Sequence, residues 1–119
     1  MDDFAEFAAE CHKWIDKFGL TEWQISIEPE DLGASNIGIR AQCCLNWTQH
    51  AVCIRWNTTH RVDALNNTGA ALTPRRAALH EVLHVLLHQL VLVSADRGSS
   101  ADVTDAQEHA VINRLMSVL

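Results

Sequence analysis

Hydrophobic residues recur every three or four positions over residues 2–18, the spacing that places them on one face of an α-helix. That face holds Phe4, Phe7, Ala8, Cys11, Trp14, Ile15 and Phe18. Gly19 follows directly, and glycine most readily takes the left-handed conformation that ends a helix. The pattern therefore predicts an amphipathic N-terminal helix that packs through this face.

Beyond Gly19 the pattern changes to alternation, which is typical of strands with one buried face. Trp23, Ile25 and Ile27 alternate with polar residues, and residues 29–36 are expected to form a loop. Two further strands are predicted over residues 37–45 and 51–57.

The second and third strands are expected to pair as an antiparallel hairpin. A two-residue turn at Thr48-Gln49 sets Trp47 opposite His50. The apolar positions then face one another, in the pairs Leu45–Val52, Cys43–Ile54 and Ala41–Trp56. On the other face Cys44 lies directly opposite Cys53. A register that keeps one face wholly apolar is the one a buried sheet selects.

Residues 58–72 are polar and contain glycine, which predicts a long connection. Thr73 is expected to cap the next helix, with Pro74 at its first position, and the helix is expected to extend to about residue 92. After a loop at residues 94–101, Thr104 and Gln107 form a capping-box pattern that predicts a last helix. The chain is thus expected to be a single α+β domain over residues 1–119, with a small three-stranded sheet and C-terminal helices.

The composition argues against two classes of partner. The chain has 48% hydrophobic residues and a formal net charge of −6, whereas proteins that bind nucleic acid or membrane surfaces usually carry a basic face. No signal peptide is recognisable in Met1-Asp2-Asp3-Phe4, and the apolar stretch at residues 77–93 is interrupted by polar side chains. The cysteines lack Cys-x-x-Cys spacing and are expected to be reduced. We therefore expect a cytoplasmic protein that binds neither nucleic acid nor membrane.

The most informative motif is His80-Glu81-Val82-Leu83-His84, which reads His-Glu-x-x-His. On a helix this spacing puts both imidazoles on one side, within reach of one metal ion. Zinc lowers the pKa of a bound water toward 7, and Glu81 is placed to take the proton of that water and pass it on. The motif predicts a zinc-dependent hydrolase of amide bonds, with His80 and His84 as metal ligands and Glu81 as the catalytic residue.

A catalytic zinc ion usually takes three protein ligands, so a third is expected from elsewhere in the chain. Glu108 shares the apolar face of the last predicted helix with Val111, Ile112 and Leu115. A carboxylate on such a face needs a positive partner, which makes Glu108 the leading candidate. His109, off that face, and Asp105, in the first turn, are its competitors.

The remaining histidines carry a weaker signal. His88 continues the motif by one more turn, but each four-residue step rotates the side chain by about 40°, so His88 is expected to line the site rather than bind the metal. His12, His50 and His60 have no partner at ligand spacing and are interpreted as ordinary polar positions. An isolated histidine pair on a helix is usually an ordinary position too, but the intervening Glu81 favours a metal site.

With these residues the chain resembles the small gluzincin-type, or minigluzincin-like, zinc metallopeptidases. These are often encoded by phages and prophages and are related in plan to the ImmA/IrrE and SprT-like groups. The resemblance covers most of the chain and rests on the motif at residues 80–84 and on Glu108-His109-Ala110-Val111. It implies one zinc ion per chain held by His80, His84 and Glu108, with Glu81 as general base and acid.

The resemblance also implies a partner and a location. A peptide or protein substrate is expected to pair with the edge strand of the sheet, and residues 51–57 are the expected edge. The protein would then act in the cytoplasm of a bacterial cell or of a phage-infected host.

One departure from the family is that the chain has no tyrosine. Such enzymes often stabilise the oxyanion with a tyrosine, histidine or arginine, and here the candidates are His88, His109 and Arg114. Loss of one oxyanion donor typically costs about a hundredfold in rate. The leading hypothesis is a peptidase with a specific protein substrate.

Two alternatives stay open at the level of the sequence. One is a zinc-binding regulatory or interaction module with little or no catalysis, and the other is a polar histidine seam that binds no metal. Glu81 distinguishes the first alternative from an enzyme, because a purely structural zinc site has no need for that carboxylate.

Overall fold

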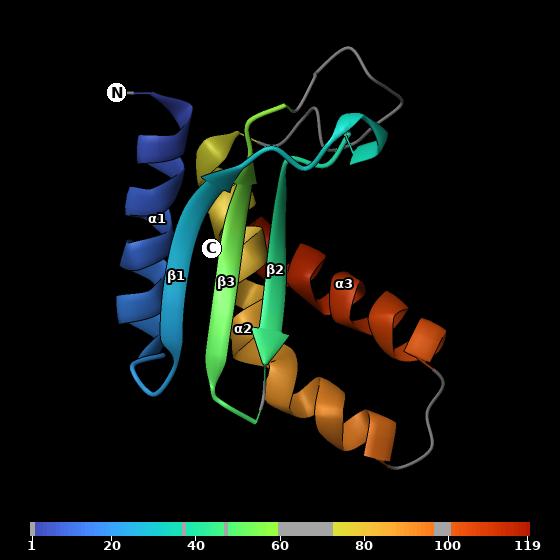
Figure 1. Ribbon diagram of the computed structural model, residues 1–119. Helices are drawn as coiled ribbons and strands as arrows, with labels where there is room; N and C mark the ends of the chain where they lie inside the picture. The colour runs from blue at the N-terminus through green and yellow to red at the C-terminus, as the bar shows by residue number, and fades with distance from the viewer. Residues whose placement is uncertain (1, 37, 47, 60–72, 97–100) are drawn as a thin grey trace.

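The computed structural model describes residues 2–36, 38–46, 48–59, 73–96 and 101–119, with the backbone alone for residues 34, 89–96 and 101–104. In chain order the elements are α1 (Asp3–Phe18), β1 (Gln24–Glu30), the short 3-10 helix η1 (Ala34–Asn36), β2 (Ala41–Asn46), β3 (Ala51–Asn57), α2 (Pro74–Asp96) and α3 (Ala101–Val118). Figure 1 shows the sheet in front of α2, with α1 beside β1 and α3 near the other edge. The predicted α+β architecture, with N- and C-terminal helices around a small sheet, is confirmed.

Helix α1 ends before Gly19 as predicted and begins at Asp3, one residue later than predicted, because Asp2 caps it. The side chain of Asp2 accepts a hydrogen bond of 2.7 Å from the Ala5 N–H, which satisfies one of the free donors of the first turn. Gly19 takes the left-handed conformation, with φ of 67°, and its N–H donates to the carbonyls of Asp16 and Ile15. The buried face of the helix consists of Phe7, Cys11, Trp14 and Ile15.

The sheet confirms the predicted hairpin register and corrects the predicted edge. Cys43 pairs with Ile54 and Cys44 with Cys53, as expected for antiparallel β2 and β3. However, β1 adds in parallel to the other side of β3, which gives the strand order β1-β3-β2. The expectation that residues 51–57 form the edge is therefore wrong, and β2 and β1 are the two edges. The reason is burial: β3 alternates buried Val52, Ile54 and Trp56 with half-buried neighbours, as a central strand does.

Two strand boundaries also differ from the prediction. Strand β1 continues through Pro29 to Glu30, because an edge strand tolerates a proline that donates no ladder hydrogen bond. Strand β2 begins only at Ala41, since the backbone before it forms turns, with the Ile39 N–H donating to the Asn36 carbonyl at 2.9 Å.

A buried asparagine holds the segment before β2. Asn57, 2% exposed, donates from Nδ2 to the carbonyls of Asn36 at 3.0 Å and Ile39 at 2.7 Å. Its Oδ1 accepts from the Leu32 N–H at 3.3 Å. The Thr59 N–H also donates to Oδ1, at 3.0 Å. One side chain thus binds four backbone groups, and it fixes the path of the chain into β2.

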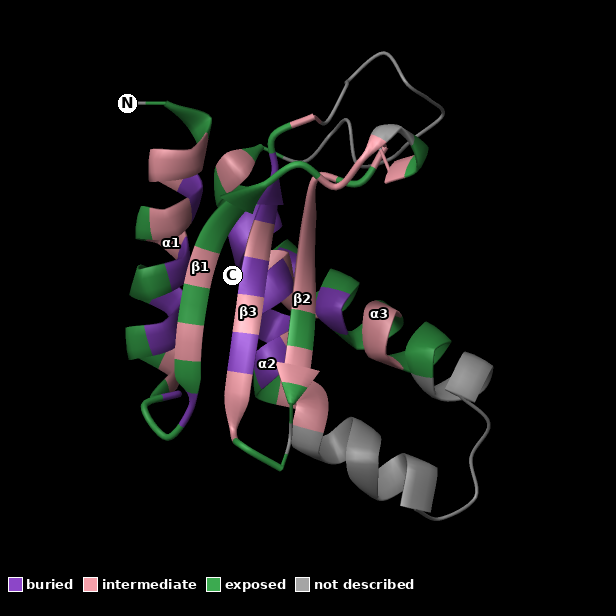
Figure 2. Cartoon of the chain, in the orientation of Figure 1, coloured by how far each residue is buried: buried purple, intermediate pink, exposed green. Residues whose placement is uncertain are grey.

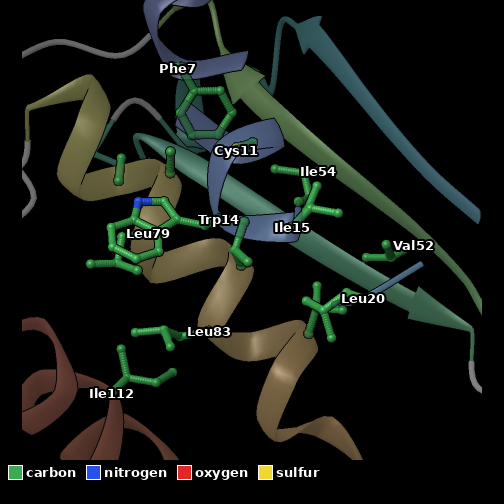
Figure 3. Close-up of a cluster of buried hydrophobic side chains, with 14 of the residues drawn as sticks. Phe7, Cys11, Trp14, Ile15, Leu20, Val52, Ile54, Leu79, Leu83 and Ile112 are labelled. Carbon is green, nitrogen blue, oxygen red and sulfur yellow. The ribbon is translucent and has the colours of Figure 1, made fainter. Parts of the chain in front are cut away.

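The apolar core lies between the sheet and the helices. Figure 2 shows buried positions alternating along β3, which lies in front of α2, and the buried side of α1 turned toward the sheet. Phe7 of α1 packs on Trp56 of β3, with ring centroids 4.8 Å apart. Figure 3 shows Leu83 of α2 beside Ile112 of α3, and both side chains are fully buried. The core therefore fixes α2 against the sheet and α3 against α2.

The two C-terminal helices are longer than predicted. Helix α2 has the predicted start, with the Arg76 N–H donating to Thr73 Oγ1 at 3.2 Å, but it extends to Asp96. Helix α3 begins at Ala101, so the predicted capping box at Thr104 is wrong, and Thr104 lies inside the helix. Among the described residues, no helix combines the length and apolarity needed to cross a membrane.

Candidate metal centre

A polar cleft of about 440 Å³ lies where α2, α3 and β2 meet. Helix α2 contributes the motif side chains, α3 contributes two carboxylates and an imidazole, and β2 forms the opposite wall. The lining residues are Ile39, Ala41, Gln42, Cys43, Leu45, His80, Glu81, His84, His88, Asp105, Glu108 and His109. Every candidate site residue of the sequence except Arg114 lies in this one cleft.

The two motif histidines converge, as the helical spacing predicts. Nε2 of His80 and Nε2 of His84 are 3.3 Å apart. Two nitrogens bound at 2.0–2.1 Å to one tetrahedral zinc ion would be separated by about 3.3–3.4 Å. The pair thus has the spacing of two metal ligands.

Helix α3 brings His109 to the same point. One ligand atom from each of His80, His84 and His109 lies within 4.8 Å of the others, and we refer to these residues as the three-histidine group. Nδ1 of His109 lies 3.0 Å from the Asp105 carbonyl oxygen. That contact is typical of ligating histidines, since a proton held on one ring nitrogen leaves the other free for a metal. The three-histidine group could therefore hold a metal ion.

Glu108 lies beside the group and contacts one of its members. Its Oε1 is 3.1 Å from Nδ1 of His84, and both side chains are largely buried. A carboxylate on Nδ1 fixes the ring and its tautomer, so that Nε2 of His84 faces His80 as an acceptor. Glu108 is thus in contact with the site, and its predicted role as the third ligand stays a prediction.

The surroundings of the histidines favour the form that binds metal. Burial, together with the neighbouring His84 and His109, lowers the pKa of His80 from 6.5 to about 4. A metal needs the neutral imidazole, because a protonated ring has no lone pair to donate. At neutral pH His80 is therefore ready to bind without first losing a proton.

Glu81 is the buried carboxyl group of the cleft. Its side chain is 8% exposed, and burial raises its pKa from 4.5 to about 8. A carboxyl group whose pKa lies near neutrality can both accept and return a proton at physiological pH. Such strongly shifted groups cluster at functional sites.

The predicted oxyanion candidates separate in the structure. His88 lines the cleft and packs edge-on against Trp23, with centroids 6.1 Å apart. Burial lowers the pKa of His88, opposed by the charge of Glu108. Arg114 is exposed on α3 and is not among the residues of the cleft. Of the three candidates, the structure thus brings His88 and His109 to the site.

Sequence reasoning missed the contribution of β2. Cys43 was expected to be a core residue, yet it also lines the cleft, as does Gln42. Burial raises the pKa of the Cys43 thiol, and the charges of Glu81 and Glu108 add to the effect. The alternation along β2 shows which residues share a face, but it does not show that this face meets the metal ligands.

Comparison with protein-family models, with curated proteins and with solved structures gave no match.

Proposed function

We propose that the protein is a zinc-dependent peptidase, in which a bound zinc ion lowers the pKa of a water ligand and polarises the substrate carbonyl. The observation that carries the proposal is the combination of the three-histidine group with a buried carboxyl group, Glu81, in one cleft. A structural zinc site is closed by four protein ligands, whereas three ligands beside a general base are typical of hydrolytic sites.

In this proposal Glu81 is the proton carrier. With a pKa near 8 in the metal-free protein, its carboxylate accepts a proton from the attacking water and returns the proton to the leaving amine. A cation bound beside it would favour the charged form of Glu81 and so lower that pKa.

The third zinc ligand is assigned to His109 rather than Glu108. Nδ1 of His109 faces its own helix, which leaves Nε2 for the metal, whereas Glu108 contacts His84 at 3.1 Å. Glu108 then acts as a positioning residue that holds the His84 ring. The resemblance to gluzincins favours Glu108 as ligand instead, so the two assignments predict different effects of substitution.

The substrate in this proposal is an extended segment of a protein, bound along β2. This strand is an edge of the sheet, and its residues Ala41, Cys43 and Leu45 line the cleft. An extended peptide can add to such an edge through main-chain hydrogen bonds.

With no tyrosine in the chain, His88 in the cleft is the candidate to stabilise the oxyanion. Free cysteines accord with a site of action in the cytoplasm.

The first experiment measures metal and activity together. Protein purified without added metal should contain about one zinc per chain by elemental analysis, and H80A should lose it. Peptide cleavage is followed by mass spectrometry on a peptide library from a digested proteome and on casein. Glu81→Gln should keep zinc and lose at least about a hundredfold in cleavage rate. Cleavage that survives in Glu81→Gln would contradict the mechanism, and a wild type that holds zinc but cuts nothing would favour the regulatory module.

The second experiment assigns the third ligand. His109→Ala should weaken zinc binding more than Glu108→Ala, which should cost about 10–100-fold as the loss of an outer carboxylate does. Competition with a fluorescent zinc chelator measures both affinities. The reverse order would give the ligand role to Glu108.

A further inference from the structure

The outer face of the sheet carries a pair of cysteines that the metal centre does not use. Cys44 on β2 and Cys53 on β3 are directly paired in the antiparallel ladder. Cys44 is exposed and Cys53 is half-buried, and both thiols are free. In Figure 1 this face of the sheet has no described helix in front of it.

The spacing of the two strands brings these cysteines within the range of a disulfide bond. The Asn57 N–H donates to the Arg40 carbonyl at 2.9 Å, and hydrogen-bonded pairs alternate along the ladder from there. Cys44 and Cys53 therefore form a hydrogen-bonded pair, in which Cα atoms are about 5.5 Å apart. Disulfides span Cα separations of about 4.4–6.8 Å, so the bond needs no change of register.

Both sulfurs lie beside Arg55 and an oxygen acceptor. Nη1 of Arg55 donates to Cys44 Sγ at 3.5 Å, and the same side chain interacts with Cys53. Cys44 Sγ donates to Gln42 Oε1 at 4.0 Å, and Cys53 Sγ donates to the Glu28 carboxylate at 4.0 Å. The guanidinium can donate a hydrogen bond to a sulfur that attacks, and the Glu28 carboxylate can accept the proton of the Cys53 thiol.

The other two cysteines lack this environment. Cys11 is fully buried, and Cys43 faces the cleft on the opposite side of the sheet. Burial raises the pKa of both thiols, which makes them poor nucleophiles. Reactivity toward oxidants is therefore concentrated at the outer pair.

We propose that Cys44 and Cys53 are a reversible dithiol–disulfide site that reacts with low-molecular-weight disulfides such as oxidised glutathione. The Cys44 thiolate attacks one sulfur of the small disulfide, whose S–S bond breaks and releases one thiol. Cys53 gives its proton to Glu28 and attacks Cys44 Sγ, which releases the second thiol. Two electrons pass to the small disulfide, and the protein loses two S–H bonds and gains one S–S bond. Excess reduced glutathione reverses both steps.

The disulfide would fasten an edge strand to the central strand. Cys44 lies between Cys43 and Leu45, which line the cleft from the other face of β2. Oxidation is thus expected to stiffen the sheet wall of the cleft without touching the metal ligands. Because the thiol chemistry takes place on the opposite face, the proposal stands whether or not the chain is a peptidase.

To test the proposal, the full chain is incubated with oxidised and reduced glutathione at a series of ratios. Free thiols are then alkylated, and the mass of the intact protein is measured by mass spectrometry. The wild type is expected to lose two hydrogens and to keep two alkylatable thiols. Cys43→Ala is the matched control, because residue 43 is the neighbour of Cys44 on the other face of β2. It should close the same bond, whereas Cys44→Ser and Cys53→Ser should each stop at a glutathione adduct. Closure in either serine variant, or a stable mixed disulfide in the wild type, would overturn the proposal.

Substitution of Arg55 gives a second test, because the rate of thiol–disulfide exchange would not change if Arg55 had only a structural role. Arg55→Gln should slow the first exchange by about three- to tenfold, and Arg55→Lys should retain most of the rate. Amide hydrogen exchange over residues 41–46 should slow in the oxidised protein. Equal closure rates in the wild type and Arg55→Gln would remove the guanidinium from the mechanism, and unchanged exchange would contradict the stiffening of β2.

Discussion

Glu81 shows how one residue can lower the stability of the metal-free fold and still be suited to proton transfer. It is 8% exposed in a cleft whose other wall includes the apolar side chains of Ala41 and Leu45. Burial there disfavours the charged carboxylate, as its raised pKa shows. A group that destabilises the metal-free fold in this way is more readily explained by function than by packing.

We expect Glu81→Gln to stabilise the metal-free protein at high pH. The folded pKa of about 8 lies above the ordinary value of 4.5, so the folded state binds the extra proton between these values. The contribution of Glu81 is therefore most favourable below pH 4.5 and is lost as the pH rises through 8. At pH 9 the variant should gain about 2–4 kcal/mol in free energy of unfolding, and at pH 4.5 close to nothing.

Urea denaturation of chelator-treated protein at the two pH values measures this difference. Glu22→Gln, at an exposed position, is the control and should show no comparable pH-dependent gain. An equal effect of Glu81→Gln at both pH values would mean that burial of the charge is not the cause.

At the scale of elements, α2 carries the motif, and its first turn is held by Thr73. The Arg76 N–H donates to Thr73 Oγ1 at 3.2 Å, and Pro74 occupies a position where no N–H is needed. From this start the motif lies two turns into the helix, where the backbone is fully hydrogen-bonded. The position of His80 and His84 therefore depends on a well-formed helix rather than on a loop.

Thr73→Ala should lower the free energy of unfolding by about 1 kcal/mol, because it removes the cap and leaves an N–H without its acceptor. Thr73→Ser keeps the hydroxyl and should lose much less. Chemical denaturation of both variants gives the comparison, and equal losses would show that the methyl group rather than the cap matters.

At the scale of the whole molecule, the proposed metal bridges α2 and α3, two helices that also pack against each other in the core. Helix α2 is covered on both sides by α1 and the sheet, whereas α3 packs through Ile112 and Met116. Since His109 lies on α3, metal binding and the docking of α3 are linked. Ligand binding to the folded state alone stabilises it by about 2.7 kcal/mol at a concentration a hundredfold above Kd.

Ile112→Ala should therefore weaken both properties. Loss of this fully buried side chain should cost about 2–5 kcal/mol in stability, and zinc affinity should fall with it. Saturating zinc should restore part of the unfolding free energy, but not when His80→Ala is added. Val111→Ala, at a neighbouring position that is 40% exposed, is the matched control. Unchanged zinc affinity in Ile112→Ala would separate the site from the docking of α3.

The features that the sequence predicted correctly are those set by neighbours along the chain. The periodicity of α1 and its end at Gly19, the start of α2 and the Leu45–Val52 register of the hairpin all follow from local spacing and turns. The approach of His80 and His84 is likewise a property of one helix. Each of these depends on contacts within a turn or a hairpin, which the order of residues fixes directly.

What only the tertiary structure decided involves contacts between segments far apart in sequence. The parallel addition of β1 makes β3 the central strand and leaves β2 beside the cleft, and the buried Asn57 fixes the segment that enters β2. The longer α3 brings Glu108 to His84 and His109 into the three-histidine group. Periodicity gives the face of each element but not its partner, because the partner is chosen by how the buried surfaces of all the elements fit together.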